Sequence, residues 1–399
     1  MNRRVKVCGA GSCLIDRIYN NVSFASPAFQ PLLSRQEGDG GLVPGQLLFE
    51  EDLERHTGQP FPTTLASVVG TRRPDSVNIG GPCIVSLINA AQLTPDISAV
   101  SYWGCHGDDS VGDKIQRLLA CTPIDLSHYR LQKGAETSST TVFSDPRHDD
   151  GHGERTFVNT IGASWHFLPD ELDDDFFSAD IVAFGATAIV PPLHQALDSL
   201  LAKAKRSGCL TVVNTVYDSL NQRQHPDRRW PLGASDDSYA HIDVLVCDHE
   251  EALRLSGTDS IDDAMAFFHT HGTGSALVTD GAHDVWVYAD SPLMEPAPLR
   301  RLPVSAKVGE TLRQGRHHGD TTGCGDNFAG GVMASIIRQT HDGQRPIDMT
   351  EAAKWGIVSG GQACFYVGGT FYERQPGEKL ALLRPLYDAY NLQTKEEKI

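Results

Sequence analysis

Long hydrophobic runs and a signal peptide are both missing from this sequence of 399 residues. No stretch of about 18 apolar residues, the length that a membrane-spanning helix needs, is present. Residues 1–7 are basic and lead into a first strand, without the long apolar core of a secretory signal. We therefore expect a protein that neither spans a membrane nor carries a signal peptide.

Paired cysteines are missing too. The nine cysteines are scattered along the chain, none forms a CxxC pair, and their number is odd. Disulfide frameworks belong to secreted proteins, whereas thiols in the cytosol are kept reduced. The pattern predicts free thiols and a cytoplasmic protein.

Basic residues are few, because 34 Lys and Arg stand against 51 Asp and Glu and give a net charge of −17 at pH 7. A chain this acidic is a poor candidate for binding nucleic acids, whose phosphates attract Lys and Arg. A small phosphate ligand is still compatible with the charge, since backbone amides and metal ions can hold it locally.

Three familiar motifs are absent as well. Without GxxxxGK[ST] the chain is not a P-loop kinase, and Gly9-Ala10-Gly11 lacks the third glycine of a dinucleotide fold. The 16 histidines include no HExxH pair and no zinc-ligand spacing with cysteines.

What the chain does contain is a regular alternation of short apolar segments and longer helical ones. Repeated units of this kind indicate a parallel or mixed sheet with helices on both faces, in a single α/β domain over 1–399. The expected strands are Val5–Gly9, Ala99–Trp103, Ile181–Gly185, Leu210–Asn214, Val244–Cys247, Ala276–Thr279 and Val285–Tyr288. The expected helices are Ile84–Leu93, Val111–Ala120, Leu193–Ser207, Glu250–Leu255 and Trp355–Tyr366.

Three segments interrupt this alternation. Residues 20–76 are rich in Gly, Pro and polar residues, and residues 137–160 alternate as a half-exposed strand pair would. Together they predict a small β-rich lid, through which two copies of the chain could pair as a homodimer. Residues 305–318 predict a basic loop ending in Arg313, Arg316, His317 and His318, which either contacts nucleotide phosphates or is solvated.

The run 319–331 carries the clearest chemical signal. It reads as a glycine turn that opens a helix, so the amides of Gly323, Cys324 and Gly325 are expected to point off the helix N-terminus. Asp326 stands beside them. An anion site next to a carboxylate suits phosphoryl transfer, with the acid taking a proton from the attacking hydroxyl. The alternative is a simple helix-entry turn with Asp326 as its cap.

The longer order Asp-Thr-Thr-Gly-x-Gly-Asp, over 320–326, resembles the signature of the ribokinase-like (pfkB) carbohydrate kinases. This resemblance implies a three-layer sandwich with a mainly parallel central sheet and a β-lid. It also implies transfer of the γ-phosphate of ATP with Mg²⁺, with Asp326 as base and Thr321 on the nucleotide side.

Further stretches match the family in order along the chain. Asp16, Gly80 and Gly81 fall where the family binds its substrate, and residues 104–112 resemble its GxxGxDxxG motif. Val85 departs from the usual Asn, which puts the usual sugar specificity in question.

The nucleotide half shows the same agreement. Asp248 and Glu251 resemble the NxxE motif that organises metal and phosphate, although Asp248 replaces Asn. Thr279 and Gly281 fall on the family's nucleotide turn. The family also places a monovalent-cation site, such as one for K⁺, near the end of the chain.

The sequence therefore predicts an ATP-dependent kinase that phosphorylates a hydroxyl of a sugar. A nucleoside kinase is the alternative, because the long lid segment resembles that of adenosine kinases. A non-catalytic ligand-binding protein on the same fold is a third hypothesis, motivated by Val85 and Asp248.

Overall fold

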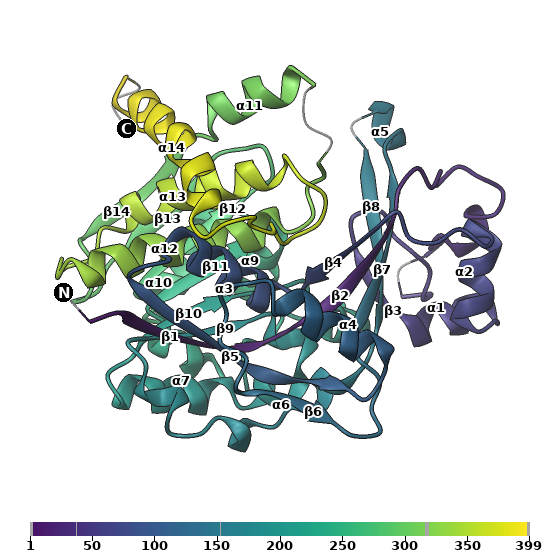
Figure 1. Cartoon of the computed structure of the whole chain (residues 1–399), viewed down its shortest axis with the longest axis horizontal. Coiled ribbons are helices and arrows are strands. Elements are labelled where there is room, and N and C mark those ends of the chain that lie inside the picture. Colours follow the sequence, from purple (N-terminus) through teal and green to yellow (C-terminus); the bar gives the residue numbers. More distant parts are fainter. Residues whose placement is uncertain (1–2, 37, 152, 316–318, 397–399) are drawn as a thin grey trace.

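The computed structural model describes residues 3–36, 38–151, 153–315 and 319–396, and it contains two β-sheets (Figure 1). The nine strands of the larger sheet lie side by side in the order β14 (Ala297–Leu302), β13 (Val285–Ala289), β12 (Ser275–Thr279), β11 (Val244–Asp248), β10 (Leu210–Asn214), β9 (Ile181–Gly185), β1 (Val5–Gly11), β5 (Ser98–Gly107) and β6 (Tyr129–Gln132). Neighbouring strands from β12 to β6 pair in parallel, and only β13 and β14 run antiparallel to their neighbours. The predicted mainly parallel sheet is confirmed.

Helices cover both faces of this sheet, as the fold class requires. One face is packed by α3 (Pro82–Leu93), α4 (Ser110–Leu119), α12 (Cys324–His341), α13 (Met349–Ala363) and α14 (Glu378–Glu396). The other is packed by α6 (Pro191–Gln195), α7 (Leu197–Arg206), α9 (His249–Ser256) and α10 (Ile261–Thr270). Alternate residues of β1 enter the two apolar cores, Val7 on the first side and Cys8 on the second. The three-layer sandwich is therefore confirmed.

The smaller sheet, which we call the lid, stands at one side of the molecule in Figure 1. Its strands lie in the order β3 (Leu47–Phe49), β8 (Glu154–Thr160), β7 (Ser139–Asp145), β2 (Leu14–Tyr19) and β4 (Ser76–Gly80). The predicted strand pair within 137–160 is confirmed as the antiparallel pair β7 and β8. It is less exposed than expected, because six of the seven residues of β7 are buried.

The prediction of a β-rich segment over 20–76 is wrong in part. The segment reaches β4 at its last residue, and before it lie a short 3-10 helix (Gln30–Leu32), the three-residue strand β3 and two helices, α1 (Glu50–Thr57) and α2 (Phe61–Val69). Its apolar side chains, among them Phe29 and Leu53, pack against Tyr19 and Phe143 of the lid strands. The aromatic and leucine content of the segment therefore serves to cover one face of the lid, as the burial of these side chains requires.

The segment 305–318 also differs from expectation. Residues 306–313 form a helix, α11 (Ala306–Arg313), whose N-terminus is capped by the Ser305 hydroxyl accepting from the Val308 amide at 3.4 Å. Arg313 lies in its last turn, and Arg316, His317 and His318 lie outside the described residues. Two further short helices are α5 (His148–Gly151) and α8 (Ser219–Gln224).

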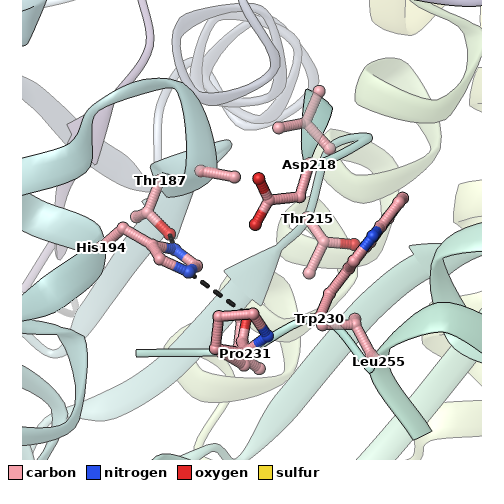
Figure 2. Close-up of a pocket in the computed structure, with 10 residues that line it drawn as sticks. Thr187, His194, Thr215, Asp218, Trp230, Pro231 and Leu255 are labelled. Carbon is pink, nitrogen blue, oxygen red and sulfur yellow. Dashed lines mark hydrogen bonds between the residues drawn. The ribbon is translucent and has the colours of Figure 1, made fainter. Parts of the chain in front are cut away.

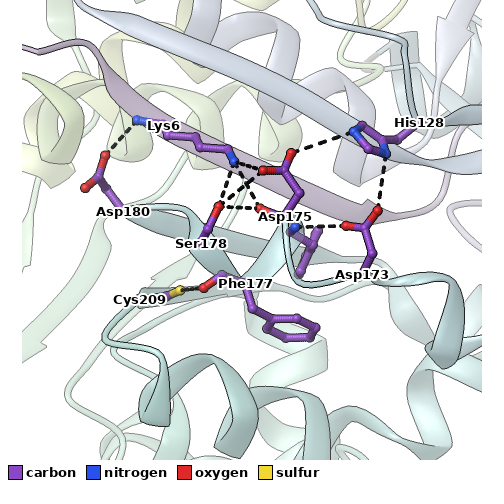
Figure 3. A network of polar contacts seen from close by, with 9 residues as sticks. Lys6, His128, Asp173, Asp175, Phe177, Ser178, Asp180 and Cys209 are labelled. Carbon is purple, nitrogen blue, oxygen red and sulfur yellow. Dashed lines mark hydrogen bonds and ion pairs between the residues drawn. The ribbon is translucent and has the colours of Figure 1, made fainter.

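The amino end of β1 is fastened by a network of charged groups (Figure 3). Lys6 Nζ donates to the Asp175 carboxylate at 2.6 Å and to the Ser178 hydroxyl at 2.8 Å, while the Lys6 amide donates to Asp180 at 2.8 Å. This network fastens the start of β1, and the other end of β1 leads within three residues into the lid strand β2. None of the described helices combines the length and apolar content needed to cross a bilayer.

Candidate active site

The two glycines at the start of α12 differ in the space around them. Gly323 is the N-cap and adopts a left-handed φ of 74°, and a side chain there would overlap the backbone of Gly369. At Gly325 the opposite holds, since a Cβ would meet no atom within 4 Å. The space above the first turn of the helix is therefore open, as an approaching ligand requires.

The amides of this turn are not all equally available. The Cys324 amide donates to the Thr321 carbonyl at 3.3 Å, so it is partly used inside the turn. The amides of Gly323 and Gly325 have no backbone partner within the described part of the chain. At the positive end of α12, these amides are suited to hold an anion, and we call residues 323–325 the anion site. The Cys324 amide is the one of the three that is least available to a ligand.

Asp326 occupies the first turn of α12 beside these amides. Its side chain keeps some contact with solvent. The surrounding protein nevertheless removes enough water to disfavour the ionised carboxylate, and this burial raises the pKa of Asp326 to about 7. A carboxyl group with such a pKa is well matched to accept a proton near neutral pH.

Asp16 lies inside the lid strand β2. Its neighbours in register are Asn78 on one side and Thr140 on the other, and Thr140 is in register with Asn159. Residues in register share one face of a sheet, so these four side chains form a continuous polar row. All four are buried, and a side chain at Gly80 would overlap the Asp16 carboxylate.

The same face of the lid points at the turn before α12. Burial, and then the negative charges of Asp326 and Asp320, raise the pKa of Asp16 to about 8 against the opposing effects of Arg155 and Thr140. Such Coulombic coupling requires that Asp16 and Asp326 lie near one another. The structure therefore brings the predicted substrate residue and the predicted base together.

Arg155, on β8, is a site residue that sequence reasoning missed. Its guanidinium donates to the Thr322 hydroxyl at 2.6 Å and also to the hydroxyl of Thr321. Asn78 makes a second bridge from the lid, donating to the Val367 carbonyl at 3.0 Å. The lid is thus attached to the loop before α12 and to the segment after α13, and it brings a positive charge next to the anion site.

Asp248 and Glu251 form a reciprocal cap at the start of α9. Asp248 accepts from the Glu251 amide at 2.8 Å, and Glu251 accepts from the Asp248 amide at 3.1 Å and from the Thr215 hydroxyl at 2.6 Å. Burial and then the charge of Asp248 raise the pKa of Glu251 to about 8. No group of three or more His, Cys, Asp or Glu side chains in the described ranges is arranged to hold a metal ion.

The remaining predicted residues fall into two groups. Thr279 ends β12, next to Asp248 in the sheet register, and Gly281 follows in a left-handed turn with open space around it. Val85 is buried in the core, where it lies against Gly369. The substitution of Asn by Val85 therefore concerns packing behind the turn rather than a side chain of a ligand site.

The 104–112 motif has a structural role in this fold. Asp109 caps α4 by accepting from the Gly112 amide at 2.7 Å, and it also accepts from the amide of Thr137 at 2.9 Å. Because Thr137 lies two residues before β7, this carboxylate ties the end of β5 to the start of the lid.

Behind the anion site lies a buried lysine that sequence reasoning also missed. Lys379 Nζ donates to Asn327 Oδ1 at 2.6 Å. The side-chain Nδ2 of Asn327 donates to the carbonyls of Gly323 and Gly369, each at 2.8 Å. Burial lowers the pKa of Lys379 to about 7. A lysine is seldom fully buried, so nothing in its surroundings along the chain signals this contact.

A second convergence of polar side chains, around His194, is too small to be the site. Figure 2 shows Thr187, His194, Asp218 and Trp230 around a cavity of about 10 Å³, which is room for about one water molecule. His194 contacts the Thr187 hydroxyl at 3.0 Å and the Pro231 carbonyl at 3.2 Å. Burial lowers the pKa of His194, so a neutral structural histidine explains this cluster.

Solved structures share the fold across most of the chain. A probable sugar kinase from Rhizobium etli CFN 42 matches with a TM-score of 0.67 and 17% identity, over 97% of this chain and 100% of that one. An adenosine kinase from Sinorhizobium meliloti matches with a TM-score of 0.67 and 18% identity, over 96% and 99%. The structure of a putative ribokinase II from E. coli, in complex with ATP and Mg²⁺, matches with a TM-score of 0.61 and 16% identity, over 96% and 99%.

Curated relatives are similar in sequence over a shorter span. A probable fructokinase-4 from Arabidopsis thaliana is 26% identical over 249 residues, covering 59% of this chain and 67% of the relative. A fructokinase from Solanum tuberosum is 29% identical over 245 residues, covering 59% and 66%. The chain thus spans about two thirds of the length of these relatives.

Free amides at the N-terminus of a helix, facing a lid with a polar row, are the arrangement that a phosphotransferase acting on hydroxyl groups needs. The model of the pfkB family carbohydrate kinase matches residues 67–373. The chain belongs to this family.

Proposed function

We propose that this protein transfers the γ-phosphate of Mg·ATP to a hydroxyl group of a sugar, with Asp326 as the general base. The observation that carries the proposal is the pairing of Asp326, with its pKa of about 7, and the open space above Gly325. A hydroxyl held between the lid and α12 would lose its proton to Asp326 as it attacks the phosphorus atom. The amides of Gly323 and Gly325 would stabilise the charge that develops on the transferred group.

The lid supplies the groups that suit a polyhydroxylated acceptor. Asp16, Asn78, Thr140 and Asn159 present carboxylate, amide and hydroxyl groups in one row, and such groups both donate to and accept from sugar hydroxyls. Because the row is buried, hydrogen bonds to it would be made away from competing water. This arrangement favours a sugar over an apolar alcohol.

Arg155 would complete the positive environment of the phosphoryl group. It reaches from the lid to Thr321 and Thr322, next to the anion site, and guanidinium groups bind phosphate oxygens well. Attachment of the lid at this point would also exclude water and so limit wasteful hydrolysis of ATP.

The cofactors follow from the family and from the donor groups. The E. coli structural neighbour contains ATP and Mg²⁺. Mg²⁺ usually keeps several water ligands and is held by one or two carboxylates and by substrate phosphates, which fits Asp248 and Glu251 acting through water. For a monovalent cation such as K⁺, Asp320 fits, because its Oδ2 is buried and has no partner in the described part of the chain.

A nucleoside acceptor is the second candidate. Phe49 is in register with Asn159, so it lies on the lid face that carries Asp16, and its ring meets that of Trp165 edge-on with centroids 5.6 Å apart. Phe49 is buried, whereas Trp165 is half-buried, and its ring beside the polar row could stack on a base. Adenosine kinases also occur among the relatives, including one from Schizophyllum commune.

The cysteines, the lid and the net charge bear on where the protein works and what it binds. All nine cysteines are free, which supports a reducing compartment such as the cytoplasm. A homodimer through the lid stays a prediction, and the apolar cluster around Phe29 leaves one lid face covered by the chain itself. The net charge of −17 continues to disfavour nucleic acids.

The experiment is an ADP-release screen of the purified chain with Mg·ATP against a panel of sugars and nucleosides. We expect release above the ATP-only rate with at least one sugar, and a product heavier by one phosphoryl group. Release with nucleosides alone would favour the second candidate. No acceptor-dependent release from any member would favour the non-catalytic hypothesis.

A further inference from the structure

Two cysteines stand apart from the other seven. Cys324, the first residue of α12, and Cys364, which follows the last residue of α13, are both half-buried, and their sulfur atoms are 3.3 Å apart. Of the others, six are buried and Cys121 is exposed on its own. Cys324 and Cys364 are thus a close thiol pair that is accessible to solvent.

The pair lies against the anion site. Cys324 sits between Gly323 and Gly325, and a side chain at Gly319 would overlap the Cys364 carbonyl. The Asp320 amide donates to the Tyr366 carbonyl at 3.2 Å, so the loop before α12 is paired with the segment after α13. Any covalent link between the two sulfurs would join these two segments at the edge of the site.

We propose that Cys324 and Cys364 form a dithiol modification site, which small-molecule disulfides oxidise to an intramolecular disulfide that switches the kinase off. The switching part rests on the proposed function. Cytosolic disulfides, where they occur, are commonly transient and regulatory, so free thiols in the resting protein agree with such a role.

The geometry needs only a small movement. A disulfide requires the sulfurs to approach from 3.3 Å to about 2.05 Å. The movement must come from the first turn of α12 or from the end of α13, because each cysteine is at an element boundary. A displacement of about 1 Å in a catalytic site costs on the order of 10²-fold in rate, so linkage should be felt at the anion site.

The chemistry is a balanced thiol–disulfide exchange. The Cys364 thiolate attacks one sulfur of the disulfide R–S–S–R, and one R–S⁻ leaves to give a mixed disulfide. Cys324 then loses its proton and attacks Cys364 Sγ, and the second R–S⁻ leaves. One disulfide is reduced to two thiols while the protein dithiol is oxidised.

The order of attack follows from the hydrogen bond between the sulfurs. The hydrogen bond between the two sulfurs lowers the pKa of Cys364 and raises that of Cys324, so Cys364 is the better candidate for the thiolate. Burial and the negative charge of Asp320 act against the thiolate in both groups, and the positive charge of Arg155 acts in its favour. By contrast, burial raises the pKa of Cys13 to about 12, which keeps that thiol inert.

The test is incubation of the full-length chain with glutathione disulfide, followed by peptide mass mapping and ADP-release assays before and after dithiothreitol. We expect a cross-linked peptide pair containing Cys324 and Cys364, two hydrogens lighter than the sum. Turnover should fall at least about tenfold and return on reduction, in line with a displaced anion site.

Matched variants separate this site from general thiol damage. Cys364→Ala should keep the turnover of the reduced parent and resist glutathione disulfide, and Cys121→Ala should be inactivated like the parent. If no cross-link forms in the parent, or if it forms without loss of turnover, the proposal is wrong. A reduced parent without any turnover would instead overturn the proposed function, and the dithiol claim would then be judged by the cross-link alone.

Discussion

Replacing Asp16 with asparagine should have two opposite effects, on stability and on substrate binding. The folded protein raises the pKa of Asp16 from 3.8 to about 8, first through burial and then through the charge of Asp326. Because the pKa is higher in the folded protein, ionisation of Asp16 does not affect the free energy of unfolding below pH 3.8. As the pH rises from 3.8 to about 8, it lowers the free energy of unfolding progressively.

The size of the effect follows from the same linkage. Each pH unit between the unfolded and folded pKa values costs about 1.4 kcal/mol, and pH 7 lies about three units above the unfolded value. The buried acid therefore lowers the free energy of unfolding by up to about 4 kcal/mol at pH 7. Asp16→Asn keeps the shape of the side chain and removes the ionisation, so the variant should be the more stable protein.

The functional effect runs the other way. Above about pH 8, where Asp16 is ionised, a hydrogen bond to its charged carboxylate contributes about 1.5–3 kcal/mol, so at such a pH Asp16→Asn should weaken acceptor binding by roughly 10- to 150-fold. Affinity for ATP should change little, because the polar row of the lid faces the acceptor.

The assay combines thermal unfolding at pH 5 and pH 8 with separate titrations of acceptor and ATP. Asp39→Asn is a matched control on the lid segment. Burial would raise the pKa of Asp39, but hydrogen bonds from the amides of Arg35 and Gly41 outweigh it and hold the pKa at about 2. Stability from Asp39 is therefore lost only as the pH falls toward 2, and Asp39→Asn should destabilise the protein at neutral pH.

A lower melting temperature of Asp16→Asn at pH 8 would refute the electrostatic reasoning. An unchanged KM for the acceptor would remove Asp16 from the substrate site. If ATP binding falls while acceptor binding holds, the orientation of the site is the reverse of the one proposed.

Three further predictions address the phosphoryl end of the site. Arg155→Met should lower kcat by roughly 10- to 100-fold through loss of charge-assisted contacts, whereas Arg147→Met on the same lid should be neutral; equal effects would make the Arg155 contact merely structural. The pH profile of kcat/KM should fall on the acid side with an apparent pKa near 7, as Asp326 becomes protonated, and an acid limb near pH 4 would contradict this. Gly325→Ala should unfold no earlier than the parent, since its Cβ meets nothing, yet turn over more slowly; normal turnover would mean that the phosphate does not approach this amide.

Local patterns were enough to predict much of the main sheet. Ile181–Gly185 and Leu210–Asn214 agree with the expected strands at both ends, because each is a short apolar run between clear breaks. The turn at 323–326 was also predictable, since a glycine-rich helix start depends on neighbours within a few residues. Among the three amides predicted to bind the phosphate, that of Cys324 is the least available, because it donates to the Thr321 carbonyl.

Long-range pairing accounts for what was missed. Asp16 lies in a lid strand because β2 pairs with β4 and β7, which lie far along the chain, and no local pattern encodes that register. Arg155 and Lys379 are ordinary basic residues in the sequence, and only the fold brings them to the turn before α12. The helices within 20–76 were missed because many Gly and Pro residues masked two short amphipathic segments.

The most direct test of the central claim is the turnover of Asp326→Asn with saturating Mg·ATP and the acceptor identified by the screen, measured as phosphorylated product. The variant should fold and bind ATP like the parent, since the Asp326 side chain has no hydrogen bond or ion pair with any other described residue that asparagine would lose. Its turnover should fall by roughly 10² to 10⁴, the usual contribution of a positioned base. A variant that works within a few-fold of the parent would show that Asp326 is not the base and that phosphoryl transfer here needs another explanation.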